Sequence, residues 1–138
     1  MTSKVHIYKD VELARYHFGP AHPFGPARYT AFVEEFNRRG LDQTTSPQVS
    51  VLASAEQIQL FHTEDYCAQV QNQSRTGRGY LDCGDTPAFF GCYEAAAWIV
   101  GSTVDAGMRM MRGEFRRGFI PIAGLHHAAR NSAAGFCI

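Results

Sequence analysis

The 138-residue sequence lacks the marks of several large protein classes. No apolar run approaches the ~18 residues that a membrane-spanning helix needs, and the N-terminal segment has no apolar core of the kind a secretion signal carries. An excess of either charge is also missing, because 13 Lys and Arg balance 13 Asp and Glu. Nucleic-acid and anionic-membrane binders usually carry a basic excess. We therefore expect a cytoplasmic protein with no nucleic-acid or membrane partner.

Paired metal-binding motifs are lacking as well. The cysteines form no C-x-x-C pair, and no Asp-x-His motif occurs in the chain. With no secretion signal, the thiols are expected to stay reduced. Small buried side chains are the ordinary structural role for such residues, and we expect it for Cys67, Cys83, Cys92 and Cys137.

What is present fits one globular α/β domain. The composition is 45% hydrophobic and 19% charged, which is typical of a chain that folds around a core. Strands are predicted at 5–8, 48–52 and 119–122, and loops at 10–26 and 71–84. Helices are predicted at 27–39, from Ser54, at 63–70 and at 87–112, the last capped by Thr86 with its methionines in the core. This alternation of strands and helices predicts a mostly parallel sheet.

Three short segments could carry chemistry. Residues 124–128, GLHHA, follow the last predicted strand, and ligands bind beyond the carboxyl ends of parallel strands. Two imidazoles there are suited to proton transfer near neutral pH, although loop histidines also bond to backbone. Residues 135–137, GFC, suit the wall of an apolar slot or an ordinary core position. Residues 84–87, GDTP, offer a carboxylate for a substrate backbone or for a helix cap.

Together these segments resemble the histone deacetylase superfamily, and most of all its bacterial acetoin-utilisation (AcuC-like) branch. The matching motifs stand in the family's order: His22-Pro23 followed by Arg28, FHTEDY at 61–66, GDTP at 84–87, GLHHA at 124–128 and GFC at 135–137. The resemblance covers essentially the whole chain. It implies a three-layer α/β/α fold with a mostly parallel sheet, of which residues 1–138 form the N-terminal part of a single deacetylase-like domain.

The resemblance also implies roles for individual residues. His126 and His127 match the tandem histidines that transfer protons during amide hydrolysis, with His127 the more important general base and acid. Asp85 matches a rim carboxylate that holds the backbone amides of the substrate. Arg28 matches an arginine in a channel below the site, near the leaving acetate. Phe136 matches one wall of the slot that holds the acetyl-lysine stem, and Gly135 lies beside it. Leu125 stands where many eukaryotic relatives carry an aromatic residue, so we expect the inner pocket to differ there.

The implied activity is zinc-dependent hydrolysis of acetyl-lysine, on an acetylated protein, or of another, small acetylated amine. In the family, the zinc ligands are an Asp-x-His pair and a later Asp, which would lie beyond Ile138. We therefore expect zinc in the full-length enzyme, and neither a catalytic metal nor activity in these 138 residues alone. An apolar sheet edge left uncovered predicts a homo-oligomer. The alternative is a truncated, non-catalytic paralogue that acts as an oligomeric binding module.

Overall fold

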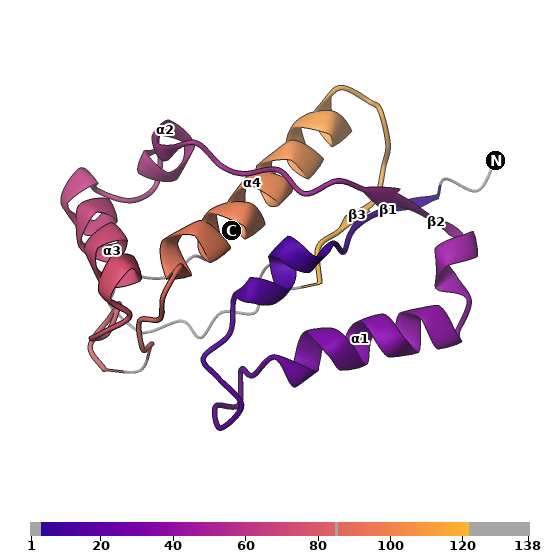
Figure 1. Cartoon of the computed structure of the whole chain (residues 1–138). Coiled ribbons are helices and arrows are strands. Elements are labelled where there is room, and N and C mark those ends of the chain that lie inside the picture. Colours follow the sequence, from indigo (N-terminus) through magenta and orange to yellow (C-terminus); the bar gives the residue numbers. More distant parts are fainter. Residues whose placement is uncertain (1–3, 85, 122–138) are drawn as a thin grey trace.

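The computed structural model describes residues 4–84 and 86–121, and their centre is a small parallel sheet (Figure 1). Its strands are β1 (Val5–Tyr8), β2 (Thr45–Gln48) and β3 (Gly118–Phe119), in the order β2-β1-β3. In the register of the central strand, His6 lies opposite Ser46 on one side and Gly118 on the other. The parallel pairing confirms the predicted α/β class.

Helices cover both faces of β1. Ile7 and Tyr8 are adjacent and both fully buried, and neighbouring strand residues point to opposite faces. Tyr8 packs with Ala106 of α4 (Cys92–Met111), in a core cluster that also holds Leu13 and Phe115. On the other face lies α1 (Ala27–Arg38), and its Phe32 ring is 5.7 Å from that of Phe119. The described residues thus form three layers, with α1 and α4 on either side of the sheet (Figure 1).

Three predicted helix ends are confirmed. Helix α1 is followed by Gly40, whose φ of 64° lies in the left-handed region that glycine tolerates. The short α2 (Ala55–Gln59) begins with the predicted capping box, in which Ser54 and Gln57 each bind the other's backbone amide. Thr63 caps α3 (Glu64–Thr76) by accepting a hydrogen bond from the Tyr66 amide.

The predicted strand at 48–52 is wrong in its position. Strand β2 ends at Gln48, and the next residues cross α4 in an extended but unpaired conformation. Their backbone bonds to the helix instead: the Val51 amide donates to Ser102 Oγ, and the Ala53 amide donates to the Ala97 carbonyl. Because the helix satisfies these amides, no further ladder forms.

Two predicted loops contain helix. The stretch 10–26 holds a 3₁₀ helix, η1 (Val11–Arg15), because Leu13 is buried against Tyr8 in the core. Helix α3 runs on to Thr76 rather than ending near residue 70, since Val70 and Ser74 are buried within a segment that is otherwise polar. A second 3₁₀ helix, η2 (Leu41–Gln43), joins α1 to β2.

The long helix also differs from its prediction. It begins at Cys92 rather than Pro87, with Gly91 at its cap position, and Thr86 does not cap it. Most buried residues of α4 are small, from Ala95, Ala96 and Ala97 to Ala106, while Met111 is 84% exposed and Met108 and Met110 are also exposed. The methionines are therefore not core residues.

Two smaller points complete the fold. Cys67 and Cys92 are buried and reduced as expected, but Cys83 is exposed, and Cys137 lies outside the described residues. Strand β3 is shorter than the predicted 119–122, with residue 122 outside the described part. Among the described residues, no helix is both long and apolar enough to cross a bilayer.

Candidate functional site

Most predicted site residues fall outside the described part of the chain. Of those residues only Arg28 is described; the others are Asp85, Leu125, His126, His127, Gly135 and Phe136. The segment with the paired histidines follows β3 in sequence, after the described chain ends at residue 121. The described segments that carry or flank the motifs of the resemblance are the loop after β1, the start of α1 and the loop before α4.

An aromatic cluster, made of Tyr16, Phe18, Phe24 and Phe89, joins the loop after β1 to the start of α4. The ring of Tyr16 lies 5.5 Å from Phe18 and 5.9 Å from both Phe24 and Phe89, in edge-to-face arrangements. Burial raises the pKa of Tyr16 well above its usual range, so the phenol stays neutral. The cluster gives this part of the molecule an apolar wall.

The loop that carries three of these rings is closed on itself. The Phe18 amide donates to the Phe24 carbonyl at 3.0 Å, and Nδ1 of His22 accepts from the Phe24 amide at the same distance. A Cβ on Gly25 would lie 3.0 Å from the Gly19 carbonyl oxygen, so the two ends of the loop are in close contact. The loop before α1 is thus a packed structure, and His22 supports its backbone.

Arg28 lies in the first turn of α1, beside the aromatic cluster. Its guanidinium carbon is 4.9 Å from the centroid of the Phe24 ring, within the range of a cation–π contact. The side chain is exposed, and among the described residues no carboxylate pairs with it. The guanidinium can therefore bind an anion that reaches this surface.

The segment 79–88, hereafter the 79–88 loop, folds as a closed turn. The Leu81 amide donates to the Thr86 carbonyl, and the Ala88 amide donates to the Gly79 carbonyl, both at 2.8 Å. Within this turn Asp82 Oδ1 accepts from the amides of Gly84 and Thr86 at 3.0 and 2.9 Å. Asp82 Oδ2 accepts from the Thr86 hydroxyl at 2.6 Å. The Asp82 carboxylate is therefore at the centre of the loop.

Helix α3 holds this loop from outside. The Tyr66 hydroxyl donates to the Leu81 carbonyl at 3.2 Å, and Gln73 Nε2 donates to the Tyr80 carbonyl at 2.8 Å. Burial, followed by the nearby Asp82 charge, raises the pKa of Tyr66 to about 12, so its hydroxyl remains a donor. Leu81 is itself buried against Val70. The 79–88 loop is thus tied to a helix at two carbonyls and one side chain.

Sequence reasoning missed Asp82 and the aromatic cluster. An Asp two residues before a Gly is a turn signal, because its carboxylate can accept from the backbone amide two residues on. That signal is present at Asp82 and Gly84. The cluster had no such signal, since Tyr16 and Phe89 are far apart in the sequence and meet only in the fold.

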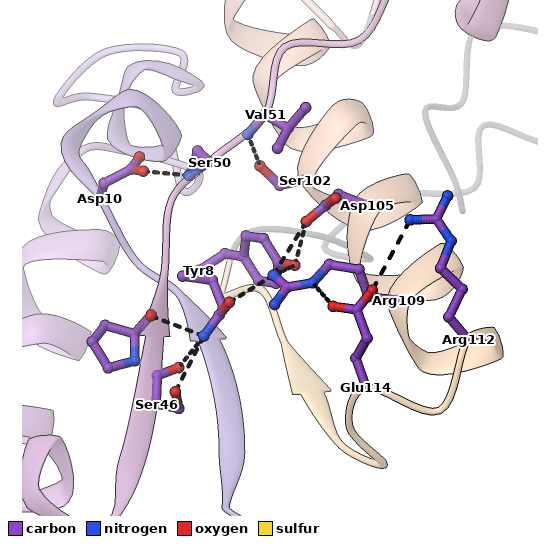
Figure 2. Close-up of polar contacts among 12 residues, drawn as sticks. Tyr8, Asp10, Ser46, Ser50, Val51, Ser102, Asp105, Arg109, Arg112 and Glu114 are labelled. Atoms are coloured by element: carbon purple, nitrogen blue, oxygen red, sulfur yellow. Dashed lines mark hydrogen bonds and ion pairs between the residues drawn. The ribbon is translucent and has the colours of Figure 1, made fainter.

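A polar network fastens β1 and β2 to α4 (Figure 2). The Tyr8 hydroxyl donates to Asp105 Oδ2 at 2.7 Å, and Arg109 donates to Gln48 Oε1 at 2.6 Å and to Glu114 Oε2 at 2.7 Å. Burial, with the Asp105 hydrogen bond, raises the pKa of Tyr8 to about 12. Because each of these groups is used in a contact, we assign the network to structure rather than to chemistry.

The described residues do not provide a metal centre. No group of three or more His, Cys, Asp or Glu side chains among residues 4–84 and 86–121 is arranged to hold a metal ion. The zinc implied by the resemblance therefore has no ligand set in this part of the molecule.

Comparison with known proteins places this arrangement in a family. The model of the histone deacetylase domain matches residues 22–138. The chain is 33% identical over 148 residues to the acetoin utilization protein AcuC of Bacillus subtilis, covering 100% of this chain and 37% of AcuC. It is 25% identical over 142 residues to human histone deacetylase 1, covering 97% of this chain and 30% of that protein.

A solved structure agrees with the fold. The crystal structure of the HDA15 HD domain superposes with a TM-score of 0.79 at 23% identity, covering 99% of this chain and 40% of that one. The chain thus spans about a third of the length of the curated relatives it matches. Since the domain model matches all but the first residues, and the parallel sheet and its helices agree with it, the chain belongs to the histone deacetylase family.

Proposed function

We propose that these residues are the N-terminal part of a zinc-dependent deacetylase. The reaction is hydrolysis of acetyl-lysine, or of another acetylated amine, to acetate and the free amine. The observation that carries the proposal is the match of the deacetylase domain to residues 22–138, because this range contains every residue to which the resemblance assigns a role.

The contribution of this chain is proton transfer and substrate binding. Hydrolysis breaks the amide C–N bond, adds a hydroxyl to the carbonyl carbon and delivers a proton to the departing nitrogen. An imidazole titrates near neutral pH and can accept the proton of water and then donate it to nitrogen. We assign this work to His127, assisted by His126. Zinc belongs to the complete enzyme, and its ligands are expected outside this chain.

Substrate selection follows from an apolar slot and two charged groups. A slot built from Leu125, Gly135 and Phe136 favours a neutral acetyl-lysine over lysine, because burying an unpaired ammonium is costly. Asp85 accepts hydrogen bonds from the substrate backbone. Arg28 pairs with the acetate product, in keeping with an exposed guanidinium that no carboxylate of the described part of the chain pairs with.

The proposal is tested by acetate release from an acetyl-lysine peptide, using the natural gene product that contains these residues. His127→Ala should lower kcat by roughly 10²–10⁴-fold, the usual contribution of a general base and acid. His126→Ala should have a smaller effect. Both variants should keep the thermal unfolding midpoint of the parent. A folded His127→Ala variant with unchanged kcat would remove the proposal.

A second experiment asks whether the substrate is a peptide. Asp85→Ala should raise KM for an acetyl-lysine peptide more than for a small acetylated amine, because only the peptide offers backbone N–H groups. Equal losses for the two substrates would show that Asp85 does not hold a peptide backbone.

We also propose self-association through the β3 side of the molecule. In the described sheet β3 pairs with β1 alone, and its Phe119, on the α1 face, is 45% exposed. On the α4 face, a Cβ on the neighbouring Gly118 would lie 3.7 Å from Sδ of Met110, which is 40% exposed. A free strand next to apolar side chains favours pairing with another chain. Light scattering of the 138-residue chain should show an oligomer, and Phe119→Lys should dissociate it. The control Leu60→Lys, at an exposed position after α2, should leave the oligomer intact. A monomeric parent would contradict this.

A further inference from the structure

We infer that Asp82 is a positioning residue, which fixes the 79–88 loop so that Asp85 can accept hydrogen bonds from a substrate backbone. This inference rests on the proposed function, because it takes the role of Asp85 from there. It adds a residue to which the resemblance assigns no role. The loop is described on either side of position 85, at residues 79–84 and 86–88.

The first step is the placement of the Asp82 carboxylate. It binds the amide of Gly84, directly before position 85, and both the amide and the hydroxyl of Thr86, directly after it. Three hydrogen bonds to one carboxylate are charge-assisted and stronger than neutral ones. The backbone on both sides of position 85 is therefore held by a single side chain.

Second, without Asp82, ordering the loop would cost conformational free energy. Gly84 has a φ of 115°, a conformation that side-chain-bearing residues rarely adopt. Glycine also has the largest backbone freedom to lose when the loop is ordered. With no acceptor at position 82, the amides of Gly84 and Thr86 would be left to water, and the loop would sample other conformations. The Asp82 bonds offset this cost before any substrate binds.

The third step is the rigidity of the support. Tyr66 and Gln73 of α3 hold the carbonyls of Leu81 and Tyr80, so the base of the loop is fixed to a helix. A binding group on a loop is placed accurately only when neighbouring contacts lock that loop. Asp82 fixes the loop at Gly84 and Thr86, and α3 fixes it at Tyr80 and Leu81.

The consequence concerns binding rather than proton transfer. A peptide that reaches Asp85 gains its hydrogen bonds without first ordering the loop, which is the advantage of a preorganised site. A small acetylated amine with no further backbone amides gains nothing from this. The loss of Asp82 should therefore raise KM for peptides, leave kcat unchanged, and spare small substrates.

The experiment is a double-mutant cycle in the natural gene product, with an acetyl-lysine peptide and N-acetylputrescine as substrates. Asp82→Ala should raise KM for the peptide roughly tenfold, the ratio that corresponds to losing one charge-assisted hydrogen bond. Asp82→Asn keeps an acceptor oxygen for the two amides and should recover most of the affinity. In an Asp85→Ala background, Asp82→Ala should have no further effect, because it acts through Asp85.

An exposed aspartate outside the loop provides the control. Asp42→Ala, at an exposed position in η2, should leave both substrates unaffected. Equal effects of Asp82→Ala on the two substrates, a change confined to kcat, or additivity with Asp85→Ala would overturn the inference. If Asp82 holds the loop, the Thr86 amide should exchange its hydrogen faster in Asp82→Ala than in the parent. An unchanged exchange rate would also overturn the inference.

The proposed function can fail separately. If the gene product hydrolyses neither substrate, the deacetylase proposal falls, and titration with the same peptide then decides the inference. The inference would still be supported if Asp82→Ala weakens peptide binding only when Asp85 is present. It would be overturned if the peptide does not bind, or if Asp82→Ala leaves its affinity unchanged.

Discussion

Gly101 lies where α4 passes closest to the chain that follows β2. A Cβ at this position would overlap the Val51 carbonyl oxygen and the Ala53 amide, and would lie 2.6 Å from the Leu52 carbonyl carbon. These are backbone atoms, which cannot rotate away as a side chain can. The absence of a side chain at Gly101 therefore permits the two hydrogen bonds that hold residues 51–53 on the helix.

This close contact gives a prediction with a matched control. Gly101→Ala should lower the free energy of unfolding by at least about 2 kcal/mol, because overpacking against backbone forces α4 and residues 51–53 apart. Gly107→Ala, in the same helix with nothing within 4 Å of the added Cβ, should raise it by about 0.5–1 kcal/mol. Urea unfolding measures both. A Gly101→Ala variant as stable as the parent would contradict the packing described here.

Tyr8 makes stability depend on pH at the alkaline end. Burial and the Asp105 hydrogen bond raise its pKa from 10 to about 12. The unfolded chain loses this proton first, so the contribution is complete below pH 10 and is lost as the pH rises to 12. Tyr8→Phe should reduce the fall in unfolding free energy between pH 10 and 12, and Tyr80→Phe, at an exposed position, serves as the control. Parallel curves for Tyr8→Phe and the parent would contradict this.

At the scale of elements, α4 differs from its neighbours in the origin of its cap. Helices α2 and α3 are capped by Ser54 and Thr63, the residues directly before them. Helix α4 has Gly91 at that position and receives its cap from α3. Ser74 Oγ accepts from the Tyr93 amide and donates to Glu94, and the Ser74 carbonyl accepts from the Gly91 amide.

Removing the Ser74 hydroxyl, which caps the first turn of α4, should destabilise the packing of α3 against α4. Ser74→Ala leaves the Tyr93 amide without its acceptor in a buried position and should cost about 1–2 kcal/mol. Thr76→Ala, which removes an exposed hydroxyl on the same helix, should change stability by less than about 0.5 kcal/mol. Thermal unfolding of the two variants tests this. Equal midpoints would show that Ser74 does not cap α4.

These elements also show what the sequence can predict. Local signals lie next to the helices that they mark, so three helices are predictable from pattern. Pro26 and Gly40 flank α1, and Ser54 and Thr63 cap the starts of α2 and α3. The start of α4 is not predictable in this way, because its cap comes from a residue distant in sequence. The strand predicted at 48–52 is wrong for a related reason, because the amides of Val51 and Ala53 bond to α4, which is distant in sequence. The methionines were misjudged because periodicity does not say how far a core extends.

For the site, family motifs predicted more than local chemistry did. Asp85, His126 and Phe136 were identified by their order along the chain, and their roles stay predictions because they lie outside the described residues. Arg28 is described, and its guanidinium lies over the Phe24 ring of the aromatic cluster, with no carboxylate paired to it among residues 4–84 and 86–121. The Asp82 contacts required coordinates, since a turn signal alone does not say what the turn carries.

At the scale of the molecule, the proposal assigns the parts of a deacetylase site to two stretches of sequence. The described residues form a parallel sheet with a helix on each face and the loops after β1 and before α4. They provide no metal-binding cluster, and the chain spans about a third of the length of its curated relatives. We propose, from the resemblance, that the proton-transfer residues lie within this chain and the zinc ligands outside it.

The most direct test measures zinc content and acetate release on two samples, the natural gene product and the 138-residue chain alone. We predict about one zinc per gene product, and acetate release from an acetyl-lysine peptide that a chelator abolishes. For the 138 residues alone we predict neither bound zinc nor acetate release. A folded, zinc-loaded gene product without turnover would contradict the deacetylase assignment. Zinc and chelator-sensitive turnover in the short chain would contradict the division of the site.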